Sequence, residues 1–265
     1  MRYVFALGLL ALTACGSDDA PPAATDQPKF AFATSSDSLY KIDTRSHAVT
    51  LVGPMTGCFD VAIVTDVAVD SAGGIFAVSD SLYKVDGASG VCTKVGGTPG
   101  VTGLAFLPKG VLDATREVLV GYAGATYVQI DTATGKTVTL GYLAKDQPAI
   151  TLSSSGDLVY SADKHLYLSV TGVDANGKTC GDCLVEVDPT KGAIVKNYGP
   201  IGYSQVYGLA AWDFAVWGFS TDGRVFSAKP AGDTLTVTAQ TLPEAGAAIA
   251  FGGAASSPLE CARRS

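Results

Sequence analysis

The sequence predicts an all-β protein, a five-bladed β-propeller closed by pairing its C-terminal strand with its first blade. Three observations lead to this prediction. A short alternating motif recurs about every 40 to 60 residues, as in solenoids and propellers. Each recurring unit contains four short strand patterns, which is the composition of a propeller blade. An incomplete unit at the start of the chain is matched by one spare strand pattern at its end.

The recurring motif reads Leu-Tyr-Lys-Ile-Asp where it first occurs. Its copies are Leu39–Asp43, Leu82–Asp86, Tyr127–Asp131, Leu184–Asp188 and a degenerate Val225–Lys229. A polar turn and a second alternating run follow most copies, which is typical of a β-hairpin. A further pair of runs precedes the motif, for example residues 67–70 and 75–78. Each unit therefore holds four strands.

The two ends of the chain complete one unit. The first unit starts at Phe30 with a pattern that matches second strands elsewhere. Residues 248–252 resemble the inner strands expected at 103–107 and 208–212. Pairing this terminal strand with the first unit would remove an open sheet edge. We therefore expect the propeller to occupy residues 30–257, followed by a tail at 258–265.

The composition agrees with a β-rich globular chain. Charged residues make up 16% of the 265 residues and hydrophobic residues 47%, with 31 glycines. A helical bundle or a charged disordered chain would carry more charge and less glycine. The 18 lysines and arginines are outnumbered by 25 aspartates and glutamates, and no basic run is present. We therefore expect no nucleic-acid partner.

The N-terminal residues have the pattern of an export signal, which we assign to residues 1–14. Arg2 supplies the positive charge, and an uncharged apolar run extends from Tyr3 to Leu12. This run is too short to cross a bilayer, which needs about 20 residues. Residues 16–28 carry no large apolar side chain, so we expect 15–29 to be a flexible tether.

Residues 12–15, Leu-Thr-Ala-Cys, resemble the lipobox of bacterial lipoproteins. The resemblance implies that Cys15 becomes the lipidated N-terminus of the mature chain, with acyl chains such as palmitate holding the protein at a membrane. It also implies a place in the bacterial cell envelope, at the outer membrane because Gly16 rather than Asp follows the cysteine. The alternative is an ordinary secretory signal that ends in a buried cysteine.

Residues Thr65–Val78, and Tyr207–Ala210 together with Trp217–Gly223, carry a second resemblance. They are similar to the blades of bacterial extracytoplasmic propellers related to the NHL type. The resemblance covers nearly all of the chain from Phe30 to Phe251, and it implies blades rather than a particular chemistry.

Six cysteines are present, and an odd number remains once Cys15 is assigned to the lipid anchor. In an exported protein we expect disulfides. Cys58 and Cys92 fall within one unit and are the preferred pair, with two free buried thiols as the alternative. Cys261 is left over near the tail.

Cys180 and Cys183 lie in the longest insertion, residues 170–183. A redox site would need a helix that begins at the first cysteine, and zinc would need a second pair of ligands. Neither is predicted, so a local disulfide that staples a hairpin is favoured.

Catalytic groups do not converge in the predicted ring. A glycosidase needs paired carboxylates across the axis, a lactonase-type cation site needs clustered Glu, Asp and Asn, and a serine nucleophile needs a nearby histidine. Asp66, Asp70 and Asp213 lie near inner strands, but the last two begin turns where Asp is common. We therefore predict no catalytic residue, no metal and no cofactor, and keep Asp66 as a candidate ligand-binding residue.

Four aspartates, Asp37, Asp80, Asp163 and Asp222, are predicted in the turn between the second and third strands of their units. Either they form an acidic rim for calcium or a cationic partner, or Asp makes the turn. The second interpretation is favoured because Asp is a common turn residue.

Three residues on the connection that enters the fifth unit, Tyr203, Gln205 and Tyr207, are further candidates for ligand binding. They either contact a ligand at the axial opening or pack between blades. We therefore expect a lipid-anchored, non-catalytic binding or scaffolding module with a protein or small-molecule partner. The alternatives are a hydrolase or lyase that uses the axial funnel, and a lectin-like propeller with similar pockets between blades.

Overall fold

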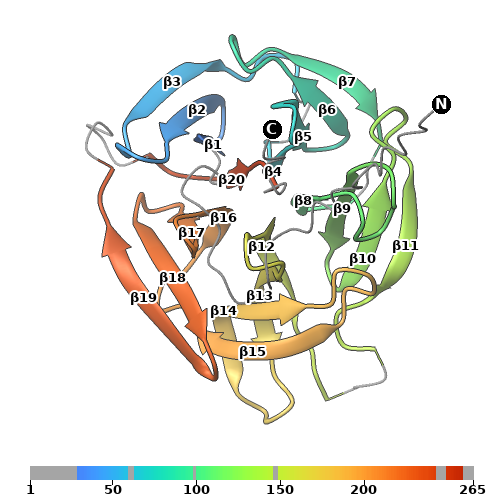
Figure 1. Cartoon of the computed structure of the whole chain (residues 1–265), viewed down its shortest axis with the longest axis vertical. Helices are drawn as coiled ribbons and strands as arrows, with labels where there is room; N and C mark the ends of the chain where they lie inside the picture. Colours follow the sequence, from blue (N-terminus) through green and yellow to red (C-terminus); the bar gives the residue numbers. More distant parts are fainter. Residues whose placement is uncertain (1–28, 59–62, 98–99, 146–148, 243–248, 259–265) are drawn as a thin grey trace, which may run out of the picture.

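The structure is a computed structural model that describes residues 29–58, 63–97, 100–145, 149–242 and 249–258. These residues form twenty β-strands and no helix. The strands make five four-stranded antiparallel sheets around a central axis (Figure 1), so the protein is a five-bladed β-propeller, as the repeat predicts. The predicted signal at 1–14, Cys15 and Cys261 lie outside the described residues. Within the described part, no helix could span a lipid bilayer.

Four blades run from the axis outward in chain order. Blade 2 comprises β4 (Asp66–Val69), β5 (Ile75–Val78), β6 (Leu82–Val85) and β7 (Cys92–Gly96), and blade 3 comprises β8 (Gly103–Leu107), β9 (Val118–Ala123), β10 (Thr126–Ile130) and β11 (Thr137–Tyr142). Blade 4 comprises β12 (Ser153–Tyr160), β13 (Leu166–Val173), β14 (Thr179–Val187) and β15 (Ile194–Pro200). Blade 5 comprises β16 (Val206–Trp212), β17 (Ala215–Ser220), β18 (Val225–Ala231) and β19 (Thr234–Gln240).

Blade 1 joins both ends of the described chain. It comprises β1 (Phe30–Thr34), β2 (Ser38–Asp43) and β3 (Val49–Pro54), with β20 (Gly253–Ser256) as its inner strand (Figure 1). In the register of β1 and β20, Thr34 lies opposite Gly253. The sequence placed the inner strand too early, at 248–252, because those residues have the apolar alternation. Residues 249–252 lead into β20 without strand structure.

The aspartate that ends most copies of the motif makes the turn to the outer strand. Asp43 Oδ1 accepts hydrogen bonds from the backbone N–H groups of Arg45 and Ser46, at 3.0 and 2.8 Å. Asp86, Asp131 and Asp188 accept the same two bonds in their own turns. These donors lower the pKa of Asp43, Asp86 and Asp131. The repeated aspartate is therefore a requirement of the hairpin.

The predicted positions of the other repeated aspartates need one correction. Asp37, Asp80 and Asp222 join second and third strands, but Asp163 lies between β12 and β13, the first and second strands of blade 4. The carboxylates are used locally: Asp80 accepts from the Tyr83 hydroxyl at 2.6 Å and Asp222 from Arg224 Nε at 2.7 Å. Because these carboxylates bond to side chains within their own hairpins, the structure supports aspartate as a turn residue rather than as part of an acidic rim that binds calcium or a cationic partner.

The hydrophobic core lies in the seams between neighbouring blades. At the seam of blades 5 and 1, Trp212 and Trp217 are both buried and stack with their ring centroids 4.2 Å apart. The edge of His47 packs on Trp217 at 4.7 Å. In the seam of blades 3 and 4, the Tyr122 hydroxyl donates to the Gly192 carbonyl at 2.5 Å. Aromatic side chains thus fix the angle between blades.

Candidate binding site in the axial funnel

Each inner strand brings one residue to an equivalent position beside the axis. These residues are Asp66 (β4), Gly103 (β8), Asp157 (β12), Gly208 (β16) and Gly253 (β20). The glycines leave no room for a side chain. A Cβ would lie 2.7 Å from the Gly156 carbonyl oxygen at Gly103, 2.8 Å from the Ala254 nitrogen at Gly208, and 2.8 Å from Asp66 Cα at Gly253. The centre therefore holds two carboxyl groups and three glycines.

Asp66 and Asp157 link neighbouring blades through the backbone. Asp66 Oδ1 accepts from the Val67 N–H at 2.7 Å, and Oδ2 accepts from the Leu104 N–H of β8 at 2.6 Å. Asp157 accepts in the same way from the N–H groups of Leu158 and of Leu209 in β16. Each carboxyl group therefore joins its own inner strand to that of the next blade.

The two carboxyl groups are also buried next to each other. Both side chains are 0% exposed, and they hydrogen bond to each other. Burial, and next the charge of Asp157, raise the pKa of Asp66 well above its usual range. Burial raises the pKa of Asp157 as well, against the hydrogen bonds that it accepts. Because two adjacent carboxylates repel each other in a low-dielectric interior, the doubly ionised pair is disfavoured and protonation is favoured relative to free aspartates.

A pocket of about 350 Å³ lies next to this pair, on the axis of the propeller. Its lining includes the residue immediately before each of the five axial positions, namely Thr65, Thr102, Gly156, Tyr207 and Gly252. The other lining residues are Ser36, Ile63, Val64, Ser155, Thr221, Ala250 and Phe251. We call this pocket the axial funnel. Its described lining consists of hydroxyl-bearing, small and apolar residues and contains no charged side chain.

One of the three candidates on the connection into blade 5 lines the funnel. Tyr207 belongs to its wall. Gln205 is exposed and is not among the lining residues, and its Oε1 accepts from the hydroxyl of the lining residue Thr221 at 2.7 Å. Tyr203 is turned away and stacks on Phe226 with ring centroids 4.5 Å apart. The structure therefore separates Tyr207 from its two predicted companions.

The position of Asp66 differs from the role predicted for it. We expected a side chain available to a ligand, but Asp66 is fully buried and both of its carboxylate oxygens accept backbone hydrogen bonds. Sequence reasoning missed its partner Asp157. The signal was present, because Asp157-Leu158-Val159 repeats the pattern of Asp66-Val67-Ala68.

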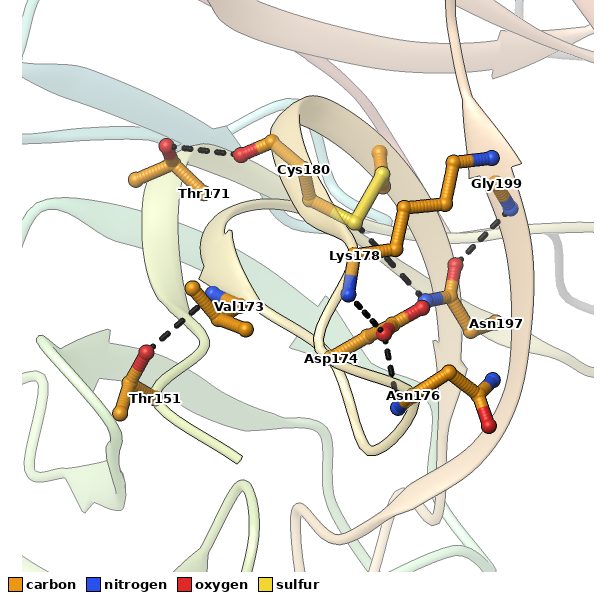
Figure 2. Close-up of a disulfide and its surroundings, with 10 residues drawn as sticks. Thr151, Thr171, Val173, Asp174, Asn176, Lys178, Cys180, Asn197 and Gly199 are labelled. Atoms are coloured by element: carbon orange, nitrogen blue, oxygen red, sulfur yellow. Dashed lines mark hydrogen bonds between the residues drawn. A yellow bond between two sulfur atoms is a disulfide. The ribbon is translucent and has the colours of Figure 1, made fainter. Parts of the chain in front are cut away.

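Both predicted disulfides are present. Cys58 and Cys92 have Cα atoms 4.9 Å apart, which contradicts the alternative of two free thiols, and Cys180 and Cys183 have Cα atoms 5.3 Å apart. The second disulfide lies in the β13–β14 hairpin, where the register shifts, and Asn197 Nδ2 lies 3.9 Å from Cys180 Sγ (Figure 2). Both of its cysteines are buried, as expected for a staple within a hairpin.

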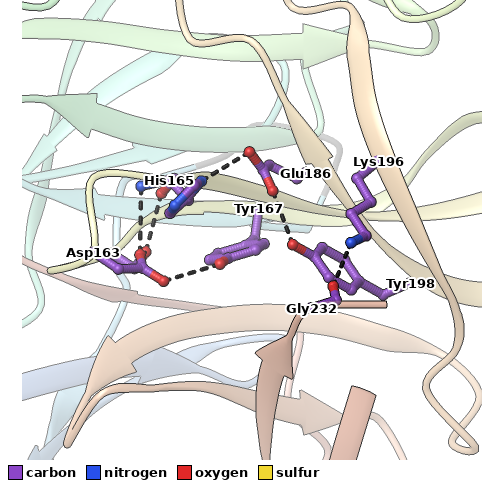
Figure 3. Close-up of polar contacts among 8 residues, drawn as sticks. Asp163, His165, Tyr167, Glu186, Lys196, Tyr198 and Gly232 are labelled. Atoms are coloured by element: carbon purple, nitrogen blue, oxygen red, sulfur yellow. Dashed lines mark hydrogen bonds and ion pairs between the residues drawn. The ribbon is translucent and has the colours of Figure 1, made fainter. Parts of the chain in front are cut away.

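A second group of polar side chains lies on blade 4 (Figure 3). His165 Nδ1 is 2.8 Å from Glu186 Oε1, and the Tyr198 hydroxyl donates to Glu186 Oε2 at 2.9 Å. Burial and the bond to Glu186 raise the pKa of Tyr198 to about 12. Tyr167 donates to Asp163 at 3.0 Å. These groups satisfy one another, and among the described residues no cluster of three or more His, Cys, Asp or Glu could hold a metal ion.

Comparison with known proteins reveals similarity in fold. No protein-family profile and no curated protein sequence matches this chain. One similar solved structure is that of a symmetrical protein whose de novo evolutionary emergence is shaped by folding constraints. Its sequence is 15% identical to this one and its TM-score is 0.49, with 87% of this chain and 99% of that chain covered.

Two further structures are similar to the chain over most of its length. YCF48 bound to D1 peptide has 11% identity and a TM-score of 0.39, over 76% of this chain and 63% of that one. Virginiamycin B lyase from Staphylococcus aureus has 12% identity and a TM-score of 0.37, over 84% of this chain and 73% of that one. At these identities the similarity concerns the fold alone, and it carries no argument about activity.

Proposed function

We propose that this protein is a lipid-anchored propeller of the bacterial cell envelope, of the NHL-like lipoprotein type, that binds a ligand in its axial funnel without transforming it. The lipobox pattern ending in Cys15 supports the anchor. The two disulfides support an oxidising compartment outside the cytoplasm. The Gly16 that follows Cys15 supports the outer membrane as its place.

The observation that carries the binding function is the chemistry of the funnel. Its described lining offers hydroxyl groups and apolar surface, which is the usual lining of a binding pocket. Among the described residues, Asp66 and Asp157 follow lining residues directly, and their carboxyl groups are buried and bonded to backbone N–H groups and to each other. General acid–base or nucleophilic catalysis needs a titratable or nucleophilic side chain within reach of the substrate. Because these two carboxyl groups are buried and already hydrogen bonded, they favour binding over catalysis.

The anchor is tested by metabolic labelling with a palmitate analogue. We expect the wild-type protein to carry the label and to fractionate with membranes, and Cys15→Ala to lose both properties. Cys58→Ala is the matched control, because it removes a cysteine of the propeller and leaves Cys15 in place. Label retained in Cys15→Ala would contradict the anchor.

The binding function is tested by native mass spectrometry of the protein extracted gently from membranes. We expect a non-covalent adduct in the wild type that is lost in Thr102→Trp, which fills the funnel. Thr50→Trp, on the exposed outer strand β3, should keep the adduct. An adduct that survives Thr102→Trp would exclude the funnel as its site. Conversion of an added ligand to a product of different mass would favour the hydrolase or lyase alternative.

A further inference from the structure

We infer that the axial funnel takes a small uncharged molecule with an apolar body and a hydrogen-bond donor such as a hydroxyl or amide N–H group. This inference rests on the proposed function and specifies the ligand of the same site.

The first step is the absence of a compensating charge in the described lining. The funnel is lined by hydroxyls from all five blades and by apolar groups, among them Val64 and Phe251. Phe251 is 1% exposed and packs against Phe219 with ring centroids 5.2 Å apart, so this part of the wall is rigid. An ion that enters such a pocket loses water and gains no partner of opposite charge, which is costly.

The second step is the sign of the charge beside the funnel. Thr65 and Gly156 line the pocket and directly precede Asp66 and Asp157 in the chain. A carboxyl pair can carry only negative charge. This charge repels an anion, while for a cation it offsets part of the lost hydration. A neutral ligand should therefore bind best and an anion worst, with a cation between them.

The third step is the direction of the hydroxyl groups. The Thr65 hydroxyl donates to the Val78 carbonyl at 3.2 Å, and the Thr221 hydroxyl donates to Gln205 Oε1 at 2.7 Å. A hydroxyl whose hydrogen is engaged offers only its lone pairs to a ligand. Every hydroxyl of the lining can accept a hydrogen bond, whereas those of Thr65 and Thr221 cannot also donate one to a ligand. The funnel therefore favours a ligand that donates.

The test uses four probes of similar size: benzyl alcohol, anisole, benzylammonium and benzoate. Dissociation constants are measured by ligand-observed NMR with the purified protein. We expect benzyl alcohol to bind about fivefold more tightly than anisole, which lacks the donor. We expect benzylammonium to bind at least about tenfold more weakly than benzyl alcohol, and benzoate more weakly still.

Two variants separate this inference from the proposed function. Thr102→Trp should abolish the binding of every probe, whereas Thr102→Asp should bring benzylammonium above benzyl alcohol. Thr50→Trp and Thr50→Asp, on β3, should leave all four constants unchanged. Binding that Thr102→Trp does not reduce would overturn the funnel as the site, and with it the proposed function. Binding that Thr102→Trp removes, but with benzoate or anisole equal to benzyl alcohol, would overturn only the ligand class.

Discussion

Replacing Asp66 by asparagine should flatten the pH dependence of the propeller's stability. The folded pKa of Asp66 is raised, so the folded state binds more protons than the unfolded state above about pH 4. The free energy of unfolding that this proton contributes is therefore complete below the unfolded pKa and is lost as pH rises toward the folded pKa. The slope is at most about 1.4 kcal/mol per pH unit for one proton.

The substitution also has a pH-independent cost. Asp66 accepts two backbone hydrogen bonds, from Val67 and Leu104, and asparagine has only one acceptor oxygen. One buried N–H group then loses its partner, which costs about 1–3 kcal/mol. Below about pH 4, where the contribution of the proton is complete, the variant should be less stable than the wild type by this amount. As pH rises from 5 to 8 the difference should shrink or reverse, because the wild type loses the stability contributed by both carboxyl groups, whereas the variant loses only that of Asp157.

Urea denaturation at pH 5, 6, 7 and 8, followed by the fluorescence of the buried Trp212 and Trp217, measures both effects. Asp70→Asn is the control, because Asp70 directly follows the other end of β4. Its Oδ1 accepts both side-chain hydrogen bonds of the turn, and the single amide oxygen of asparagine can accept them as well. Measuring above pH 5 avoids the range in which the turn aspartates titrate. Parallel stability curves for the wild type and Asp66→Asn would refute the raised pKa of Asp66.

Two further predictions concern the packing and the covalent links of the ring. Gly253→Ala should lower the free energy of unfolding by about 1–3 kcal/mol, because the new Cβ would lie 2.8 Å from Asp66 Cα. Gly97→Ala is the control and should be nearly neutral, because Gly97 has open space around it. Equal melting temperatures for the two variants would contradict the crowding at the axis. Replacing Cys58 and Cys92 by serine removes a disulfide that spans 34 residues and should lower the free energy of unfolding by about 4 kcal/mol. Replacing Cys180 and Cys183, which are 3 residues apart, should lower it by less than about 2 kcal/mol. Equal losses in urea denaturation would show that loop length does not set the difference.

The blades were predictable because each repeats a local requirement. A third strand such as Leu39–Asp43 packs between two seams, so it buries Leu39 in one and Ile42 in the other, and its final aspartate must accept the N–H groups of the turn. Both requirements are visible within a few residues. The Cys58–Cys92 disulfide was predictable for a related reason, since the repeat places both cysteines in one unit.

The centre of the ring was predicted less well because it is assembled from five distant segments. The terminal strand was placed at 248–252 by its apolar pattern, but the position is decided by Gly253, which must fit against Asp66. Asp157 was missed although it repeats the local pattern of Asp66, because the pattern alone does not show that its carboxyl group bonds to Leu209 of β16. Tyr207 could be placed at the axial opening from its position before an inner strand, whereas the packing of Tyr203 on Phe226 depends on a contact between separate strands.

The pairing of β20 with β1 has a consequence for how the protein folds. The inner edge of β1 stays unpaired until β20, the last of the described strands, has been synthesised, so a nascent chain presents a vacant strand position to its neighbours. At high concentration the β20 of one molecule can fill that position in another, giving a reciprocal exchange that preserves every hydrogen bond of the ring. We expect refolding at increasing protein concentration to yield strand-exchanged dimers, measurable by size-exclusion chromatography. Their absence would mean that β20 pairs with β1 of its own chain before it meets another molecule.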